Sequence, residues 1–124
     1  MSQAKPSGPP TPLRVQRLEG FWARARGLLG RPPPSPGEAV QLIPCRQVHC
    51  LGMRYAIDVV HLDKAGKILR IATVRPWLMS RYVGAATSIL ELAAGEASRL
   101  GLEVGMTPSL IEVPTRASRD GSSS

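Results

Sequence analysis

Between residues 45 and 61 the sequence gathers side chains of the types that bind metals. Cys45, His49, Cys50 and His61 together supply the four sulfur and nitrogen ligands of a tetrahedral zinc site. On an extended strand Cys45 and His49 share a face, whereas the adjacent His49 and Cys50 point to opposite faces. The chain also lacks the C-x₂-C and H-x₃-H spacings of compact zinc sites. We therefore predict no metal and no cofactor, and expect a buried structural cysteine beside a partly exposed histidine.

The same residues suggest a thiol nucleophile. Cys50 follows His49 and lies near Arg46 and Arg54, and positive neighbours of this kind lower the pKa of an exposed thiol. Adjacent positions on a strand, however, do not allow the Cys–His hydrogen bond that activates such a nucleophile. The sequence predicts no catalytic residue, and a metal- or thiol-dependent enzyme is kept only as an alternative.

Asp58 is a carboxylate inside an apolar run, Ile57–Leu62. It either faces outward or is buried, and a buried carboxylate must be paired because an isolated charge in apolar surroundings is costly. Arg54, Arg70 and Arg75 are candidate partners, and the backbone is another. We expect a structural contact for Asp58, with a ligand-binding or acid–base role as the alternative.

The main functional hypothesis is a non-catalytic binding module with a cluster of polar side chains on one sheet face. The cluster consists of His49, Arg54, Asp58 and Trp77. It would bind an unknown small ligand or a protein segment. Taken alone, Trp77 follows Arg75-Pro76 and is expected to pack against the sheet, and Met79 is expected to fill the core or its rim.

Short strands must position these residues. Apolar and β-branched runs predict strands at Val40–Ile43, Val48–Leu51, Ile57–Leu62, Ile68–Val74, Ile89–Leu92 and Leu110–Val113. Asp63–Lys67 predicts a hairpin turn with Gly66 at positive φ. Helical spacing at Phe21–Leu29 and capping residues around Gly95–Leu100 predict two short helices. The expected fold is α+β and β-dominated, with a single strongly curled, half-barrel-like antiparallel or mixed sheet.

Length and composition predict one domain. The chain has 124 residues, and its ends are rich in Pro, Ser and Gly. We expect disordered tails at 1–13 and 115–124 around a single globular domain at 14–114. No run reaches the roughly 18 apolar residues of a membrane span, and no export signal is apparent, so we expect a cytoplasmic protein with no membrane partner.

Basic residues outnumber acidic ones by 16 to 9, which gives a net charge of +7. The densest positive zone consists of Arg14, Arg17, Arg24, Arg26 and Arg31. Such a zone can neutralise phosphates, so a weakly nucleic-acid-associated protein is the second hypothesis. The five aromatic residues do not alternate with Arg or Lys along any predicted strand, as a base-stacking platform would require.

Four sequence segments, occurring in a fixed order, are similar to segments of a known protein family. They are FWARARGLLGR at 21–31, VHCLGMRYAIDVVHLDKAGKIL at 48–69, RPW at 75–77 and ILELAAGEASRLGLEVGM at 89–106. Together they resemble the domain of unknown function 192 family, small and mostly bacterial and archaeal proteins. The resemblance implies a compact β-rich α+β domain without an established activity. This chain departs from the family at Ala56 and Ala93, where members usually carry proline, and at Met106 in place of an acidic residue.

Overall fold

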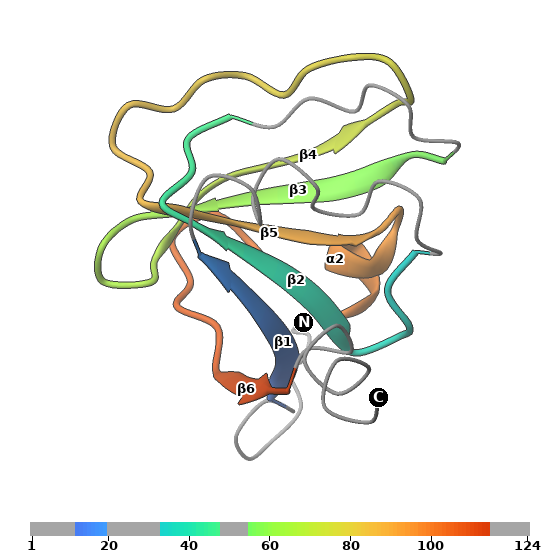
Figure 1. Ribbon diagram of the computed structural model, residues 1–124, viewed down its shortest axis with the longest axis vertical. Helices are drawn as coiled ribbons and strands as arrows, with labels where there is room; N and C mark the ends of the chain where they lie inside the picture. The colour runs from blue at the N-terminus through green and yellow to red at the C-terminus, as the bar shows by residue number, and fades with distance from the viewer. Residues whose placement is uncertain (1–11, 20–32, 48–54, 115–124) are drawn as a thin grey trace, which may run out of the picture.

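The structure is a computed structural model that describes residues 12–19, 33–47 and 55–114. The bounds of the strands are β1 (Leu13–Glu19), β2 (Glu38–Ile43), β3 (Ile57–Leu62), β4 (Ile68–Val74), β5 (Ser88–Ala93) and β6 (Leu110–Val113). A short helix, α2 (Glu96–Arg99), follows β5. Figure 1 shows the strands fanned across the molecule, with α2 beside β5.

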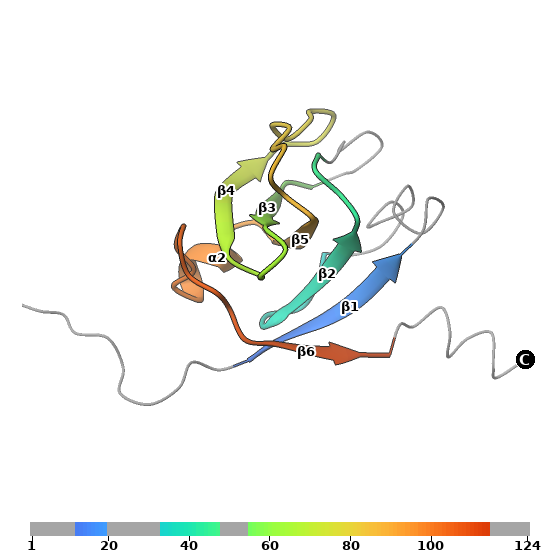
Figure 2. The same cartoon turned by 90° about the vertical axis from the view of Figure 1, so that its left-hand side faces the viewer.

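The six strands form one mixed sheet in the order β4-β3-β5-β2-β1-β6. The four strands β4, β3, β5 and β2 pair antiparallel, whereas β1 runs parallel to both β2 and β6. β5 therefore lies at the centre, between β3 and β2. The sheet is open, with β4 and β6 at its two edges, and Figure 2 shows these edge strands on different sides of the molecule.

The β3–β4 hairpin is closed by the turn that the sequence predicts. Gly66 has a φ of 85°, a value that residues with a Cβ rarely adopt. The carboxylate of Asp63 accepts hydrogen bonds from the backbone N–H groups of Ala65 and Lys67, both at 2.9 Å. Those bonds hold the pKa of Asp63 below its usual value, with the Lys67 bond making the largest contribution.

The two faces of the sheet carry separate apolar clusters because successive side chains on a strand point to opposite faces. One face, which we call the α2 face, buries Leu13, Val15, Ala39, Val60, Leu62, Ile68, Leu90, Leu92 and Ala97 of α2. The other face, which we call the Glu91 face, buries Val40, Leu42, Ile57, Val59, Val74 and Ile89. Fully burying one such side chain contributes about 1.5–3 kcal/mol, so both faces stabilise the sheet.

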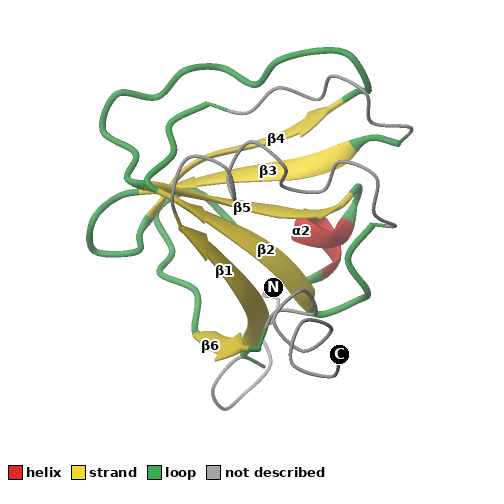
Figure 3. Ribbon diagram, in the orientation of Figure 1, coloured by secondary structure: helices red, strands yellow, loops and turns green. Residues whose placement is uncertain are grey.

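α2 is fastened to the start of β2. Glu96, in its first turn, accepts a hydrogen bond from the backbone N–H of Gly37 at 2.8 Å. It also pairs with Arg99 through two side-chain hydrogen bonds, at 2.7 Å and 2.5 Å. Figure 3 shows this helix in red against the yellow strands, with long loops at the sheet ends.

Most predicted elements are confirmed. The strands Ile57–Leu62, Ile68–Val74 and Leu110–Val113 have the predicted bounds, and β2 and β5 extend the predicted ranges by one or two residues. The predicted helix Phe21–Leu29 and strand Val48–Leu51 lie outside the described residues. The single β-dominated mixed sheet is confirmed, whereas the strongly curled half-barrel is not.

β1 is an element that the sequence analysis missed. Its buried Leu13 and Val15 alternate with the exposed Arg14 and the half-buried Gln16, which is the period of a strand. Arg14 and Arg17 belong to the predicted positive zone, and their charges mask this alternation in the sequence.

Candidate functional site

The first of the predicted binding residues, Asp58, is occupied by protein contacts. Only 2% of Asp58 is exposed. One carboxylate oxygen accepts a hydrogen bond from the Thr73 hydroxyl at 2.7 Å, and the other accepts one from the backbone N–H of Ala97 at 2.9 Å. Asp58 thus joins β3 to β4 and to α2. His49 and Arg54, its predicted companions, lie outside the described residues.

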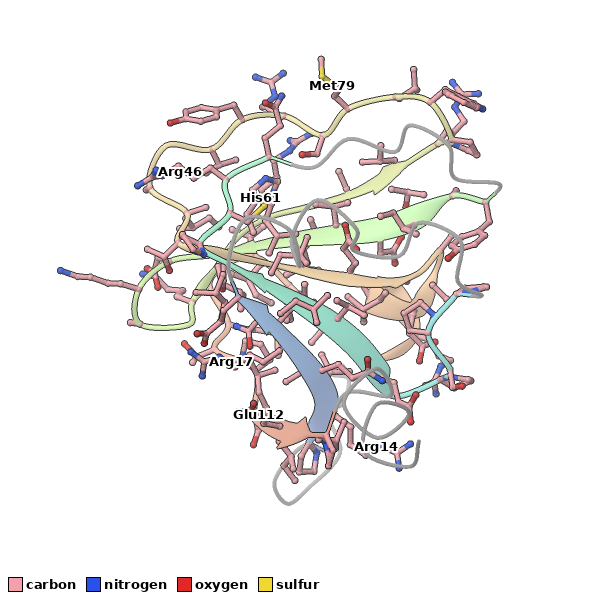
Figure 4. All side chains as sticks on the ribbon, in the orientation of Figure 1. Arg14, Arg17, Arg46, His61, Met79 and Glu112 are labelled. Atoms are coloured by element: carbon pink, nitrogen blue, oxygen red, sulfur yellow. The ribbon has the colours of Figure 1, made fainter. Side chains whose placement is uncertain are left out.

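Trp77 lies in the connection between β4 and β5, residues 75–87, which we call the β4–β5 segment. It is 65% exposed, so the expectation that it packs against the sheet is wrong. Its φ of 70° is left-handed, a strained conformation for a bulky residue that surrounding contacts must maintain. Met79 is also exposed, contrary to expectation, and Figure 4 shows it pointing away from the sheet.

Large apolar and basic side chains are exposed together on this segment and on the neighbouring residue 46. They are Arg46, Arg75, Trp77, Leu78, Met79, Arg81 and Tyr82, which we call the exposed patch. No acidic residue occurs between Asp63 and Glu91 in the sequence. The exposed patch therefore combines apolar surface with positive charge.

Hydrogen bonds from the segment after β2 hold the β4–β5 segment in place. The Gln47 side chain donates to the Ser80 carbonyl at 3.0 Å, and the Arg46 Nε donates to the Gly84 carbonyl at 3.1 Å. The backbone N–H of Val83 in turn donates to the Arg46 carbonyl at 3.1 Å. These bonds anchor the backbone at Ser80, Val83 and Gly84, next to the exposed side chains.

A second group of polar side chains lies on the Glu91 face. His61 on β3 is directly opposite Arg70 on β4 and opposite Ile89 on β5, and Glu91 is two residues beyond Ile89. His61, Arg70 and Glu91, which we call the polar row, therefore lie on one face of three neighbouring strands. Within the described part of the chain, the buried side-chain atoms that lack a hydrogen-bond partner are His61 Nδ1, Arg70 Nε and Glu91 Oε1.

The contacts of His61 define its hydrogen-bonding capacity. Its Nε2 lies 3.1 Å from the carbonyl oxygen of Arg46, which can only accept, so we assign the proton to Nε2. Nδ1 is then an acceptor with a free lone pair. Burial lowers the pKa of His61, against the opposing effect of the Arg46 and Arg81 carbonyls, and keeps the ring neutral. Figure 4 shows His61 beside Arg46.

Glu91 is the least compensated carboxyl of the described residues. It is 5% exposed and lies opposite Val59 on one side and Val40 on the other. Burial in this apolar surrounding raises the pKa of Glu91 to about 7. At neutral pH the carboxyl therefore exchanges between its protonated and ionised forms.

The described part of the predicted nucleic-acid zone carries paired charges. Arg14 forms an ion pair with Glu38 at 3.1 Å and Arg17 forms one with Glu19 at 3.1 Å. Because Arg14 and Arg17 are three residues apart on a strand, they point to opposite faces. Figure 4 shows both at the β1 end of the molecule. Arg24, Arg26 and Arg31 lie outside the described residues.

The described cysteine and histidine of the predicted metal cluster have protein partners. The Cys45 thiol donates to the Gln47 carbonyl at 3.2 Å, and His61 Nε2 is engaged by the Arg46 carbonyl. Among residues 12–19, 33–47 and 55–114, no three His, Cys, Asp or Glu side chains are grouped as metal ligands.

Glu91 was not among the residues predicted from the sequence, although its position carries a usable signal. Glu91 is a single charge in the apolar run Ile89–Leu92, the same pattern that drew attention to Asp58. The exposed patch left a weaker signal, the Arg-x-Trp and Arg-Tyr pairs at 75–77 and 81–82.

Comparison with known proteins establishes the family. The model of the DUF192 family, described as "Uncharacterized ACR", matches residues 2–110. The chain belongs to this family. A UPF0127 protein of Thermococcus sibiricus is 29% identical over 97 residues, which cover 74% of this chain and 62% of that protein. The chain thus spans less than two thirds of that relative.

Two solved structures share the fold. A protein of unknown function from Novosphingobium aromaticivorans has a TM-score of 0.66 and 19% identity, over 73% of this chain and 70% of the other. A Sinorhizobium meliloti protein described as a "putative transcription regulator" has a TM-score of 0.64 and 22% identity, over 73% and 76%. At these identities the likeness concerns the fold alone. Among the described helices, none has the length and apolar character needed to cross a membrane.

Proposed function

We propose that this member of the DUF192 family is a binding module that recognises an acidic segment of a partner protein through the exposed patch. The single observation that carries the proposal is the exposure of four large apolar side chains on a backbone held by hydrogen bonds. Such side chains are normally buried or in contact with a partner when they occur together. Because hydrogen bonds already order this part of its backbone, this protein would lose little conformational entropy of its own on binding.

The side-chain types of the exposed patch fit a protein partner. Trp, Tyr, Met and Arg are enriched in the centres of protein interfaces, and Trp, Tyr and Arg are the usual hot-spot residues. Leu78 and Met79, which lie between the aromatic residues in sequence, offer apolar surface that a phosphate backbone would not use. These features favour a protein segment over a nucleic acid.

The charge of the exposed patch indicates the character of the partner. Arg46, Arg75 and Arg81 surround the apolar side chains, and the stretch from Lys64 to Leu90 contains no acid to neutralise them. Carboxylates in a partner would pair with these guanidinium groups and accelerate association. We therefore expect a segment that combines Asp or Glu with a few Leu or Phe side chains.

Fluorescence anisotropy with defined probes tests the proposal. The probes are a labelled synthetic peptide of alternating Glu, Leu, Asp and Phe, the same peptide with Lys at every acidic position, and an oligothymidine of equal length. We expect the acidic peptide to bind at least about tenfold more tightly than the other two probes. Trp77→Ala and Tyr82→Ala should each weaken it about tenfold or more, which corresponds to about 1.4 kcal/mol.

Val104→Ala is the matched control because Val104 is 64% exposed but lies outside the exposed patch. It should bind the acidic peptide as the unmodified protein does. An equal loss of affinity for the acidic peptide in Trp77→Ala and Val104→Ala would contradict the proposal. So would tighter binding of the oligothymidine than of the acidic peptide.

Nucleic-acid association through Arg14, Arg17, Arg24, Arg26 and Arg31 remains a prediction. If it is correct, oligothymidine affinity falls steeply between roughly 50 and 200 mM salt because condensed counterions are released on binding. A flat response to salt would eliminate it.

A further inference from the structure

We infer that the polar row is a second binding site, one for a small zwitterion whose ammonium group binds at Glu91 and His61 and whose carboxylate binds at Arg70. This inference does not rest on the proposed function, because it uses side chains of the sheet face and not those of the exposed patch, although the backbone of Arg46 contacts His61.

The strand register sets the span of the site. Directly opposite residues such as His61 and Arg70 have Cβ atoms about 4.5–5.5 Å apart, and diagonal neighbours such as His61 and Glu91 are about 7–8 Å apart. Arg70 and Glu91 are separated by β3, which amounts to two strand spacings of about 4.8 Å each. Both have long side chains that can approach each other across β3. A ligand that joins the two side chains would therefore be small, with only a few heavy atoms.

The unpartnered atoms define the complementary ligand. His61 Nδ1 and Glu91 Oε1 are acceptors, the latter when the carboxyl is ionised, whereas Arg70 Nε is a cationic donor. An ammonium group donates to both acceptors and neutralises the carboxylate. A carboxylate at the other end of the ligand accepts from the guanidinium group. Each unpartnered atom then gains a charge-assisted hydrogen bond.

The surroundings favour a zwitterion over a simple ion. Val40, Val59 and Ile89 on the same face are all buried, so any ligand there loses its water. An amine alone would leave the buried Nε of the half-buried Arg70 without a partner, and a carboxylate alone would leave the buried Glu91 without one, whereas buried polar groups need a partner. Of the other charged residues described on this face, Arg14 and Glu38 already pair with each other.

Binding should release protons. Burial raises the pKa of Glu91 to about 7, so about half of the carboxyl groups are protonated at pH 7. An ammonium ligand binds the ionised form and displaces the remaining protons. The neutral His61 accepts from the same ammonium group through Nδ1.

Calorimetric and amide-shift titrations with glycine, β-alanine and 4-aminobutyrate test the inference, with methylamine and acetate as single-charge controls. We expect one of the three zwitterions to shift the amides of β3, β4 and β5, and to release about half a proton at pH 7, measured in two buffers of different ionisation enthalpy. Glu91→Gln and Arg70→Met should each weaken that zwitterion about tenfold or more. Methylamine and acetate should each bind at least about tenfold more weakly than that zwitterion.

Glu112→Gln is the control variant, since Glu112 is an exposed acid on the edge strand β6 and should leave binding unchanged. Glu91→Gln keeps the side-chain size, and amide spectra of both polar-row variants report whether they fold. Absence of shifts from all three zwitterions at roughly 10 mM, or equal affinity in Glu91→Gln and the unmodified protein, would overturn the inference. Neither result would bear on peptide binding at the exposed patch.

Discussion

At the scale of single residues, two carboxyl groups in neighbouring central strands have opposite environments. Asp58 on the α2 face receives a hydrogen bond on each oxygen, from Thr73 and from the backbone of Ala97. Glu91 on the other face lies between Val40 and Val59, and its buried Oε1 has no partner among the described residues. The hydrogen bonds of Asp58 therefore join β3 to β4 and to α2, whereas burial of Glu91 raises its pKa and favours its protonated form.

The raised pKa of Glu91 predicts a pH-dependent stability. Because its pKa in the folded state is about 7 and its ordinary value is 4.5, the folded protein binds the proton more tightly than the unfolded chain. That stabilisation is complete below pH 4.5 and is lost as the pH rises through 7. Between pH 4.5 and pH 8, the unfolding free energy of the unmodified protein should fall by about 3 kcal/mol more than that of Glu91→Gln.

Urea denaturation of both proteins at several pH values measures this difference. The comparison cancels the contribution of His61, whose lowered pKa acts in the opposite sense by removing stability as the pH falls. Parallel pH profiles for the two proteins would show that Glu91 is not the responsible group.

The contacts of Asp58 predict a structural role. Asp58→Ala removes the acceptor of the buried Ala97 N–H and of the Thr73 hydroxyl, and should cost about 2–4 kcal/mol of unfolding free energy. Thr73→Val removes one donor at an exposed position and should cost about 1 kcal/mol. Thermal or urea unfolding measures both changes. A loss in Asp58→Ala no larger than in Thr73→Val would indicate that the contact with α2 contributes little.

At the scale of elements, α2 has only four residues and depends on side-chain contacts for its position. Glu96 is central because it contacts both Arg99 and the backbone before β2. The Arg99 guanidinium and the Gly37 N–H hold the pKa of Glu96 below its usual value. The helix and the start of β2 therefore form one unit.

Removing the Glu96 carboxylate should loosen that unit. Glu96→Ala is expected to cost about 1–2 kcal/mol in unfolding free energy and to accelerate amide exchange at Gly37. Glu103→Ala, at an exposed acid after the helix, is the control and should change neither quantity. Unchanged exchange at Gly37 in Glu96→Ala would contradict the contact.

The elements also show what could be predicted from the sequence. The β-branched run Ile57–Leu62 and the turn at Gly66 were predictable because local alternation and a required positive φ leave a direct mark. The hydrogen-bond partner of Asp58 on α2 was not predictable, because Ala97 lies 39 residues away and is brought close only by the pairing of β5 with β3. The exposure of Trp77 was not predictable for a related reason. Its position depends on the β4–β5 segment, which is held by contacts with Arg46 and Gln47, about 30 or more residues earlier in the chain.

At the scale of the whole molecule, the exposed patch and the arginines of the predicted nucleic-acid zone on β1 occupy different parts of the structure. The exposed patch lies on the connection beyond the β4 edge of the sheet, whereas Arg14, Arg17 and Glu112 lie near the β6 edge. Positive charge at the β6 edge is compensated by Glu19 and Glu38, whereas the exposed patch has no acidic neighbour in the stretch 64–90. The exposed patch thus combines large apolar side chains with arginines that no acidic residue of the same stretch pairs with.

The central claim is that the exposed patch is the recognition surface, and a residue-resolved amide-shift map with the acidic peptide tests it most directly. We predict saturating shifts at residues 45–47 and 75–87 and at the Trp77 indole N–H, assigned with Trp77→Phe. Shifts in β1 and β6 should be absent. Shifts concentrated at Arg14 and Arg17, or none at the Trp77 indole N–H at saturation, would contradict the account.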